Sequence, residues 1–166
     1  MPTTVENLKT AFAGESQANR KYLAYAAKAV KEGYPQIAKL FRAAAEAETL
    51  HALAHLQSLG GVGATLDNLK DAIAGETYEY SQMYPPMVEQ AEQEGHRGKN
   101  MLQWASKVEK VHAELYRQAL AALEAGKDLS NLEIYLCPVC GHLELGAPPQ
   151  KCPVCGLAGA KFQKQG

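Results

Sequence analysis

The chain has 166 residues, 46% of them hydrophobic, which is enough for one well-packed core and a small additional module. Its 17 basic and 18 acidic residues leave a net charge of -1, so it lacks the positive excess that binds a nucleic-acid backbone. No stretch approaches the roughly eighteen apolar residues of a membrane span, and no basic segment followed by an apolar run opens the chain. We therefore expect a cytoplasmic protein with no nucleic-acid or membrane partner.

Apolar residues that recur every three or four positions predict four helices in the first part of the chain. Thr3 and Glu6 form a capping box before the first helix, and Pro35 suits the first turn of the second. In the third helix, Pro85 and Pro86 must break or kink the hydrogen-bond ladder. Such helices predict a bundle, either antiparallel throughout or with a crossover after the second helix. The predicted ranges are 3–31, 35–59, 67–84 with a continuation to 95, and 99–124.

The helical region contains an internal repeat with an offset of 61 residues. The segment NLKTAFAGES at 7–16 returns as NLKDAIAGET at 68–77. Each half contains a Glu in its first helix and a Glu-x-x-His motif in its second. The paired residues are Glu15 with Glu76, Glu48 with Glu109, and His51 with His112.

These paired residues are candidate metal ligands. Positions i and i+3 of a helix share a face, so each Glu-x-x-His motif directs two ligand atoms the same way. Carboxylates and imidazoles turned toward a core are costly unless a cation compensates them. Two Glu residues and two Glu-x-x-His motifs form the ligand set of carboxylate-bridged dimetal sites in bundles. Iron and manganese both suit these oxygen and nitrogen donors, and a duplicated surface pattern without metal is the alternative.

The two halves differ at one position on the ligand face. Ala18 follows the first Glu by three residues, whereas Glu79 follows its counterpart Glu76 by three residues and shares its face. Glu79 is therefore a seventh candidate ligand, and an exposed acidic residue is the alternative. Tyr22 and Tyr84 are candidates for hydrogen bonds to ligand carboxylates, and ordinary core tyrosines are the alternative.

The C-terminal region changes composition and contains all four cysteines in two CPVCG segments, 137–141 and 152–156. Two Cys-x-x-Cys pairs can place four thiolates tetrahedrally around one ion, and their clustering argues against disulfides. Both zinc and iron occupy such sites. The predicted metal ligands are Cys137, Cys140, Cys152 and Cys155.

Together these features resemble the rubrerythrin family over nearly the whole chain. The motifs GESQANRKY and GETYEY, the two Glu-x-x-His pairs and the CPVCG segments carry the resemblance. It implies a mainly α protein with a ferritin-like di-iron four-helix bundle and a small rubredoxin-like domain with short β-strands. The implied domain ranges are 1–126 for the bundle, 127–134 for a linker, and 135–166 for the rubredoxin-like domain.

The resemblance also implies roles for individual residues. Glu48 and Glu109 bridge two irons, and His51 replaces Glu79 as a ligand when the site is reduced. Tyr22 matches a tyrosine beside the site. The remaining implied roles are Glu15 and Glu79 on one iron, Glu76 and His112 on the other, Tyr84 as the second tyrosine, and the four cysteines on a third iron that zinc can replace.

The function implied by the resemblance is reduction of hydrogen peroxide to water during oxidative stress. Electrons would travel from NAD(P)H through a separate reductase or a rubredoxin, and then through the four-cysteine iron to the di-iron pair. A homodimer or larger homo-oligomer is expected. The alternatives are a ferroxidase or oxidase that uses dioxygen, and an iron-storage protein with a structural zinc tail.

Overall fold

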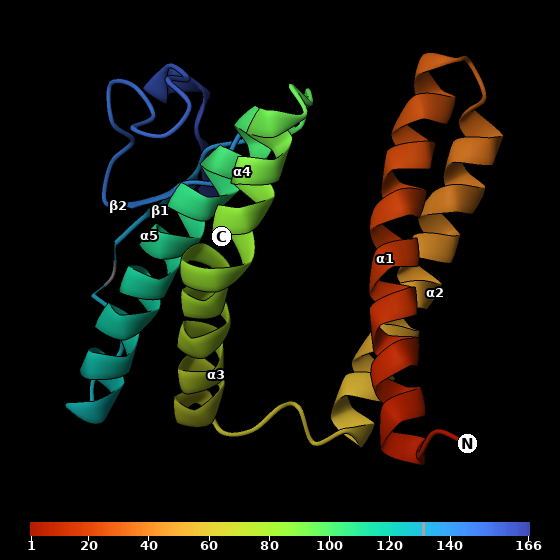
Figure 1. Cartoon of the computed structure of the whole chain (residues 1–166), viewed down its shortest axis with the longest axis horizontal. Helices are drawn as coiled ribbons and strands as arrows, with labels where there is room; N and C mark the ends of the chain where they lie inside the picture. The colour runs from red at the N-terminus through yellow and green to blue at the C-terminus, as the bar shows by residue number, and fades with distance from the viewer. Residues whose placement is uncertain (131) are drawn as a thin grey trace. The chain divides into compact units, whose positions relative to one another are not determined.

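The computed structural model describes residues 1–130 and 132–166. Its chain divides into two compact units, residues 1–63 and residues 64–166 (Figure 1). The predicted linker contains Asn131, which lies outside the described residues. Helices account for most of the described chain, and a small antiparallel sheet follows them, which confirms the predicted mainly α fold class.

The first unit is a hairpin of two long helices, α1 (Thr4–Lys31) and α2 (Pro35–Ser58). The capping box is present: the Thr3 hydroxyl accepts a hydrogen bond from the Glu6 amide at 3.2 Å, and the Glu6 carboxylate accepts one from the Thr3 amide at 2.7 Å. Gly33, with a φ of 84°, ends α1. Small side chains let the two helices approach closely. The buried alanines are Ala26, Ala29, Ala38, Ala45 and Ala52.

The helices of the second unit are α3 (Thr65–Tyr78), α4 (Tyr84–Gln93) and α5 (Lys99–Glu124). A π-helical segment, η1 (Glu79–Met83), joins α3 to α4. The interruption expected at Pro85 and Pro86 therefore takes the form of a wider helical turn before the prolines. The prolines themselves occupy the first turn of α4, immediately after the wider turn.

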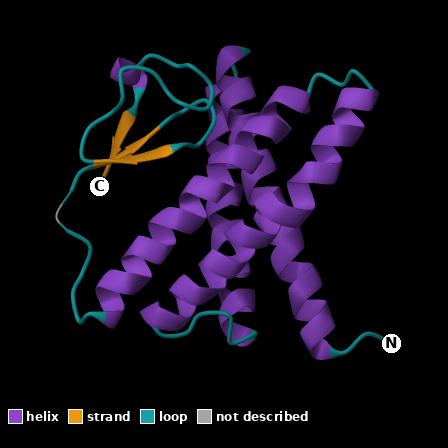
Figure 2. Ribbon diagram, turned by 60° about the vertical axis from the view of Figure 1, so that its left-hand side comes forward, coloured by secondary structure: helices purple, strands orange, loops and turns teal. Residues whose placement is uncertain are grey.

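The C-terminal part of the second unit is a three-stranded antiparallel sheet with the cysteine-containing turns beside it (Figure 2). Its strands are β1 (Ile134–Leu136), β2 (Leu143–Leu145) and β3 (Gln163–Gln165), in the order β2-β1-β3. Gly141 and Gly156 follow the two Cys-x-x-Cys turns with φ values of 87° and 77°, which favour glycine. We call residues 134–166 the cysteine module.

The cysteine module packs against α5 within the second unit. Val108 of α5 exposes only 2% of its surface and forms a cluster with three buried cysteines. Trp104 of the same helix and Phe162 of the module pack around this cluster. None of the helices in the described parts of the chain combines the length and the apolar character needed to cross a membrane.

Candidate metal centres

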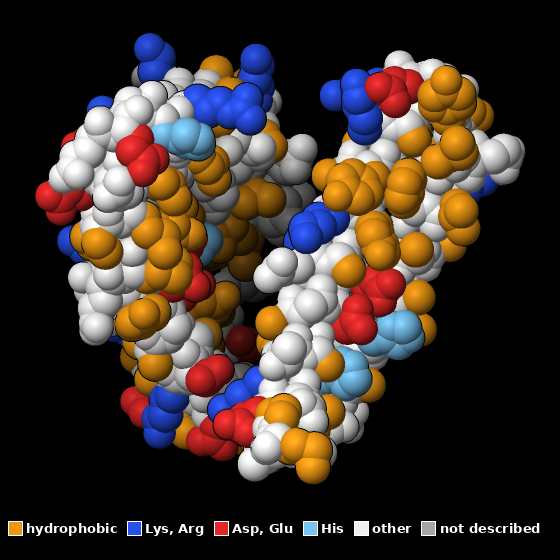
Figure 3. Space-filling model, turned by 45° about the vertical axis from the view of Figure 1, so that its right-hand side comes forward, with side chains coloured by type: hydrophobic (Ala, Val, Ile, Leu, Met, Phe, Trp, Pro, Cys, Tyr) orange, Lys and Arg blue, Asp and Glu red, His pale blue; other side chains and the backbone are white. Residues whose placement is uncertain are grey.

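The first unit brings together Glu15 of α1 with Glu48 and His51 of α2, which we call the first donor set. One ligand atom of each residue lies within 4.8 Å of the others. His51 Nδ1 is 2.9 Å from Glu48 Oε2, and the His51 side chain is 57% exposed. Figure 3 shows acidic and histidine side chains side by side on this helix pair, with hydrophobic side chains around them. The repeat in the sequence therefore predicted a real spatial cluster.

The second unit contains the matching cluster, Glu76 of α3 with Glu109 and His112 of α5, which we call the second donor set. Its ligand atoms also lie within 4.8 Å of one another. His112 Nδ1 is 2.9 Å from Glu109 Oε2 and 3.7 Å from Glu76 Oε1. The three side chains expose between 16% and 21% of their surface. This set is therefore more enclosed than the first set at its histidine.

The second donor set carries more negative charge than its protein surroundings compensate. Burial raises the pKa of Glu76 to about 7, and the nearby Glu109 carboxylate adds to the shift. Burial and Glu109 also raise the pKa of Glu79. The pKa of His112 is raised mainly by its hydrogen bond with Glu109. A bound cation would compensate these carboxylates, so the donor chemistry fits a metal site.

A hydrogen bond to the cysteine module orients one of the histidines. His112 Nε2 donates to the carbonyl oxygen of Gly141 at 3.1 Å, because a carbonyl can only accept. With Nε2–H donated to Gly141, Nδ1 is the nitrogen that faces Glu109 and Glu76, and it can bind a metal ion in place of the proton that it shares with Glu109. Such a hydrogen bond on the far nitrogen is typical of metal-ligating histidines. Among the described residues His51 Nε2 has no hydrogen-bond partner, so the two histidines differ.

Glu79 and Tyr84 lie at the two ends of the π-helical segment. Glu79 is half-buried but is not one of the three donors within 4.8 Å of one another. Burial raises the pKa of Tyr84, and the carboxylates of Glu109, Glu79 and Glu76 raise it further. Both residues therefore lie close enough to the second donor set to interact with it electrostatically. A plain 3.6-residue period in the sequence does not signal a π turn, so the sequence predicted these two residues near the site but not the π turn between them.

Tyr22 lies in an aromatic cluster of the first unit. Its ring centroid is 6.3 Å from that of Tyr25 and 6.2 Å from that of Phe41. These contacts are what a core tyrosine makes, and they leave its predicted role beside the carboxylates a proposal. His55 and His96 belong to none of the donor clusters within the described chain.

The four cysteines converge on one point in the cysteine module. The Sγ atoms of Cys137 and Cys155 are 3.5 Å apart, as are those of Cys140 and Cys152. All four Sγ atoms lie within 4.8 Å of one another. Sulfur atoms bound tetrahedrally at about 2.3 Å from an ion are roughly 3.8 Å apart, so the cluster fits a tetrahedral metal ion.

The Cys137 thiol of this cluster has a lowered pKa, which favours metal binding. Burial opposes ionisation of Cys137, but hydrogen bonds from the backbone at Cys140 and Val139 outweigh it and lower its pKa to about 7. The Cys137 thiolate is therefore populated at neutral pH, and thiolates are the metal-binding form of cysteine.

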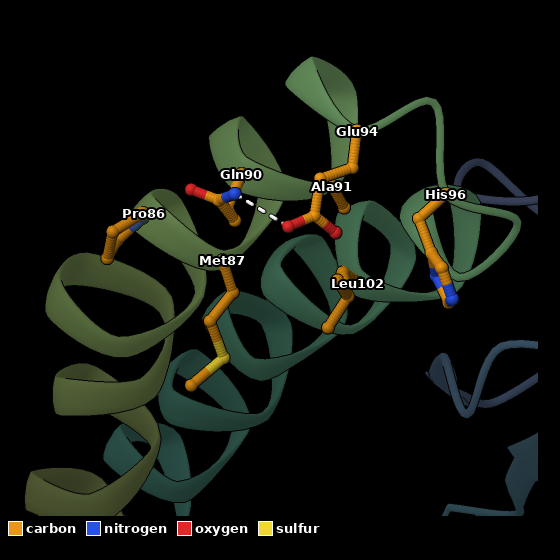
Figure 4. A pocket seen from close by; sticks show the side chains of 7 residues that line it. All are labelled: Pro86, Met87, Gln90, Ala91, Glu94, His96 and Leu102. Atoms are coloured by element: carbon orange, nitrogen blue, oxygen red, sulfur yellow. Dashed lines mark hydrogen bonds between the residues drawn. The ribbon is translucent and has the colours of Figure 1, made fainter.

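A separate groove of about 470 Å³ lies beside the turn between α4 and α5 (Figure 4). Met87, Ala91 and Leu102 give it apolar walls, and Gln90 donates a hydrogen bond to Glu94 at 2.7 Å across its edge. His96 also lines it, with Nδ1 accepting from the Gly98 amide. None of the predicted ligands lines this groove, so the candidate chemistry resides in the donor sets and the cysteine cluster.

Comparisons with known proteins agree with both kinds of metal centre. Residues 6–120 match the family Rubrerythrin, and residues 135–163 match the family described as Rubrerythrin, rubredoxin-like domain. Rubrerythrin-2 of Clostridium acetobutylicum is 37% identical over 96% of this chain and 95% of its own length. Nigerythrin of Nitratidesulfovibrio vulgaris is 38% identical over 92% of this chain and 82% of its own length.

A solved structure also supports membership of this family. The partially reduced state of nigerythrin matches with a TM-score of 0.58 and 34% identity, over 99% of this chain and 88% of that chain. The family matches and the donor clusters support a carboxylate di-iron site and a four-cysteine rubredoxin-like iron site as the cofactors. They make the protein an iron-binding oxidoreductase with a ferritin-like helical region. The chain belongs to the rubrerythrin family.

Proposed function

We propose that the protein is a non-haem di-iron peroxidase that reduces hydrogen peroxide to two waters, with electrons supplied through the four-cysteine iron centre. The observation that carries this proposal is the packing of the cysteine module on α5, the helix that supplies Glu109 and His112. A one-electron carrier docked on the helix of candidate redox-metal ligands supports electron delivery, because a hydrogen bond links His112 to Gly141, the residue after Cys140.

We propose that the two donor sets together hold the iron pair. Glu48 and Glu109 would bridge, and Glu79 would exchange with His51 between oxidised and reduced forms. The exposed, singly hydrogen-bonded ring of His51 supports this exchange, because no second hydrogen bond in the described chain fixes its orientation. The remaining assignments are Glu15 with Glu79 on one iron, Glu76 with His112 on the other, and Cys137, Cys140, Cys152 and Cys155 on the single iron.

A ferrous iron pair held by these donors would supply both electrons that reduction of the peroxide O–O bond needs, with no one-electron radical released. The reaction also consumes two protons for each peroxide. The raised pKa of Tyr84 keeps its hydroxyl protonated at neutral pH, so this O–H can donate a hydrogen bond to a carboxylate or to the substrate. Tyr22 is the second candidate donor. His112 stays oriented throughout because Gly141 holds its Nε2 proton.

The electrons would come from outside the chain. The sequence contains no Gly-x-Gly-x-x-Gly motif for a nicotinamide, so a rubredoxin or an NAD(P)H-dependent reductase would reduce the cysteine module. We place the protein in the cytoplasm, where reducing conditions keep the thiolates available for iron. A homodimer or larger homo-oligomer is consistent with Leu40 and Leu50, which expose 70% and 69% of their surface on α2.

The test mixes the reduced, iron-loaded protein with hydrogen peroxide in a stopped-flow instrument and repeats the experiment with dioxygen. We expect peroxide to oxidise the iron pair faster than dioxygen does. Rapid oxidation by dioxygen together with slow oxidation by peroxide would favour the ferroxidase alternative instead. Metal analysis and the visible spectrum test the storage alternative, because a ferric-thiolate site is red and a zinc tail is colourless.

A further inference from the structure

Asn19 is a buried polar residue in the contact between α1 and α2. It exposes 8% of its surface, and it and His142 are the two buried polar residues of the described chain. Its Nδ2 donates to the carbonyl oxygen of Ala45 at 2.7 Å and to Thr49 Oγ1 at 2.8 Å. Its Oδ1 has no hydrogen-bond partner among the described residues. An amide that is only half satisfied is unfavourable for folding, so its stabilising value is small.

The apolar contacts beside Asn19 do little to set how the two helices slide along each other at the ligand end of the hairpin. Ala45 and Ala52 are buried there, and their methyl groups offer no deep ridges for interlocking, whereas Phe41 packs against Ala26, Ala29 and Ala38 nearer the turn. A single buried Asn among small or apolar contacts is an established way to specify helix register, because displacement would leave its amide unpaired. Asn19 is the buried polar residue of this helix contact, and its hydrogen bonds to Ala45 and Thr49 select the register at the ligand end of the hairpin.

That register places the ligands of the first donor set together. Asn19 on α1 pairs with positions 45 and 49 on α2, so in an antiparallel hairpin residue 15 lies opposite about residue 51. Ala45 and Thr49 flank Glu48 on its own helix. Sliding by one helical turn would displace Glu15 from Glu48 by about 5.4 Å, which is more than the spread of the whole donor set.

We infer that Asn19 is a positioning residue that holds Glu15 in register with Glu48 and His51 for metal binding. The inference rests on the proposed ligand role of the first donor set, not on the substrate. It explains why a polar group is buried in this contact although the fold gains little from it. Removing the Asn19 amide leaves its partners satisfied, because Thr49 Oγ1 also donates to the Ala45 carbonyl at 3.1 Å.

The test uses the full-length protein with zinc in the cysteine cluster and no metal elsewhere, titrated with Co²⁺ as the spectroscopic probe. The variant Asn19→Leu keeps the number and branching of the side-chain heavy atoms and removes the amide. We expect its thermal midpoint to stay at or above that of the unchanged protein. We also expect its Co²⁺ affinity to fall by about tenfold or more, with shifted absorption bands, as for other residues that orient ligands. In the double variant Asn19→Leu with Thr49→Val, the losses of Co²⁺ affinity from the two single variants should be less than additive.

The matched control is Ala26→Gly, which weakens the same helix contact two turns from Asn19 without touching the amide. It should lower the thermal midpoint and leave the Co²⁺ spectrum unchanged. Wild-type affinity and spectrum in Asn19→Leu would overturn the inference, as would an affinity loss matched by an equal loss in the control. Unchanged Co²⁺ binding in the variant Glu15→Ala would overturn both the ligand assignment and this inference. Failure of peroxide to oxidise the iron pair would overturn only the proposed function.

Discussion

His112 and Gly141 join a metal-ligand helix to the cysteine module of the same chain through a hydrogen bond of 3.1 Å. Gly141 follows Cys140 directly, so one end of this contact is covalently next to a thiolate ligand. The other end is an imidazole of the second donor set. This contact places the cysteine module beside candidate metal ligands of its own chain.

Loosening this docking should slow electron delivery. Val108→Ala removes a buried side chain between α5 and the cysteines, and we expect it to destabilise the protein by on the order of 2 kcal/mol. The rate at which the cysteine iron re-reduces the iron pair, measured by stopped-flow absorbance, should fall. Val111→Ala, one turn along the same helix and outside the cysteine cluster, is the control. Equal rates in both variants would show that docking does not limit electron delivery.

Glu79 should matter for turnover more than for metal retention. We expect Glu79→Ala to bind close to the normal amount of iron, because the three donors of the second set remain. Its peroxide turnover should fall by at least about tenfold, the usual effect of disturbing a ligand environment. Glu89→Ala, an exposed carboxylate on α4, controls for general loss of charge. Unchanged turnover in Glu79→Ala would mean that the difference between the two halves has no catalytic role.

The metal-free protein should lose stability as the pH rises toward 7. Glu76 has a folded-state pKa of about 7, raised from 4.5 mainly by burial, so between these values the folded state binds more protons than the unfolded state. Folding is then favoured by protons, and stability declines as the pH increases through this window. Urea unfolding at several pH values measures it. In Glu76→Gln this part of the pH dependence should disappear.

Metal binding should release the proton that the Glu76 carboxyl carries in the metal-free protein. At pH 6 most Glu76 carboxyls of the metal-free protein are protonated, so a divalent ion must displace a proton to bind. Calorimetric titration of the metal-free protein in buffers of different ionisation enthalpy should detect more proton release at pH 6 than at pH 8. Equal release at both values would contradict the raised pKa of Glu76.

Loss of the cysteine iron should leave a single oxidation of the reduced iron pair intact but stop continued turnover. We expect Cys137→Ala to abolish the red absorption of the module, because one thiolate of the four is lost. Chemically reduced protein should still consume one peroxide per iron pair, whereas catalysis driven by the electron donor should stop. Continued donor-driven turnover in this variant would support the ferroxidase alternative, which makes no use of the module.

The sequence by itself determined the helical elements and the candidate metal-binding residues. Caps and punctuating residues such as Thr3, Gly33 and Pro35 act locally, so the helix boundaries matched within about two residues. The repeat placed Glu48 and His51 on one helix face, because a three-residue spacing has the same geometric meaning wherever it occurs. The four-cysteine metal site was equally predictable from the sequence, since two Cys-x-x-Cys pairs in a reducing compartment rarely serve another purpose than metal binding.

Only the tertiary structure decided the features that depend on contacts between distant segments. The π turn that begins at Glu79 directly precedes the turn with Pro85 and Pro86, and no periodic signal in the sequence predicts it. The hydrogen bond from His112 to Gly141 joins residues 29 positions apart, and that from Asn19 to Ala45 joins residues 26 apart. Such pairs form because two helices, or a helix and the module, meet at one register. That register is selected by packing and by the need to satisfy buried polar groups.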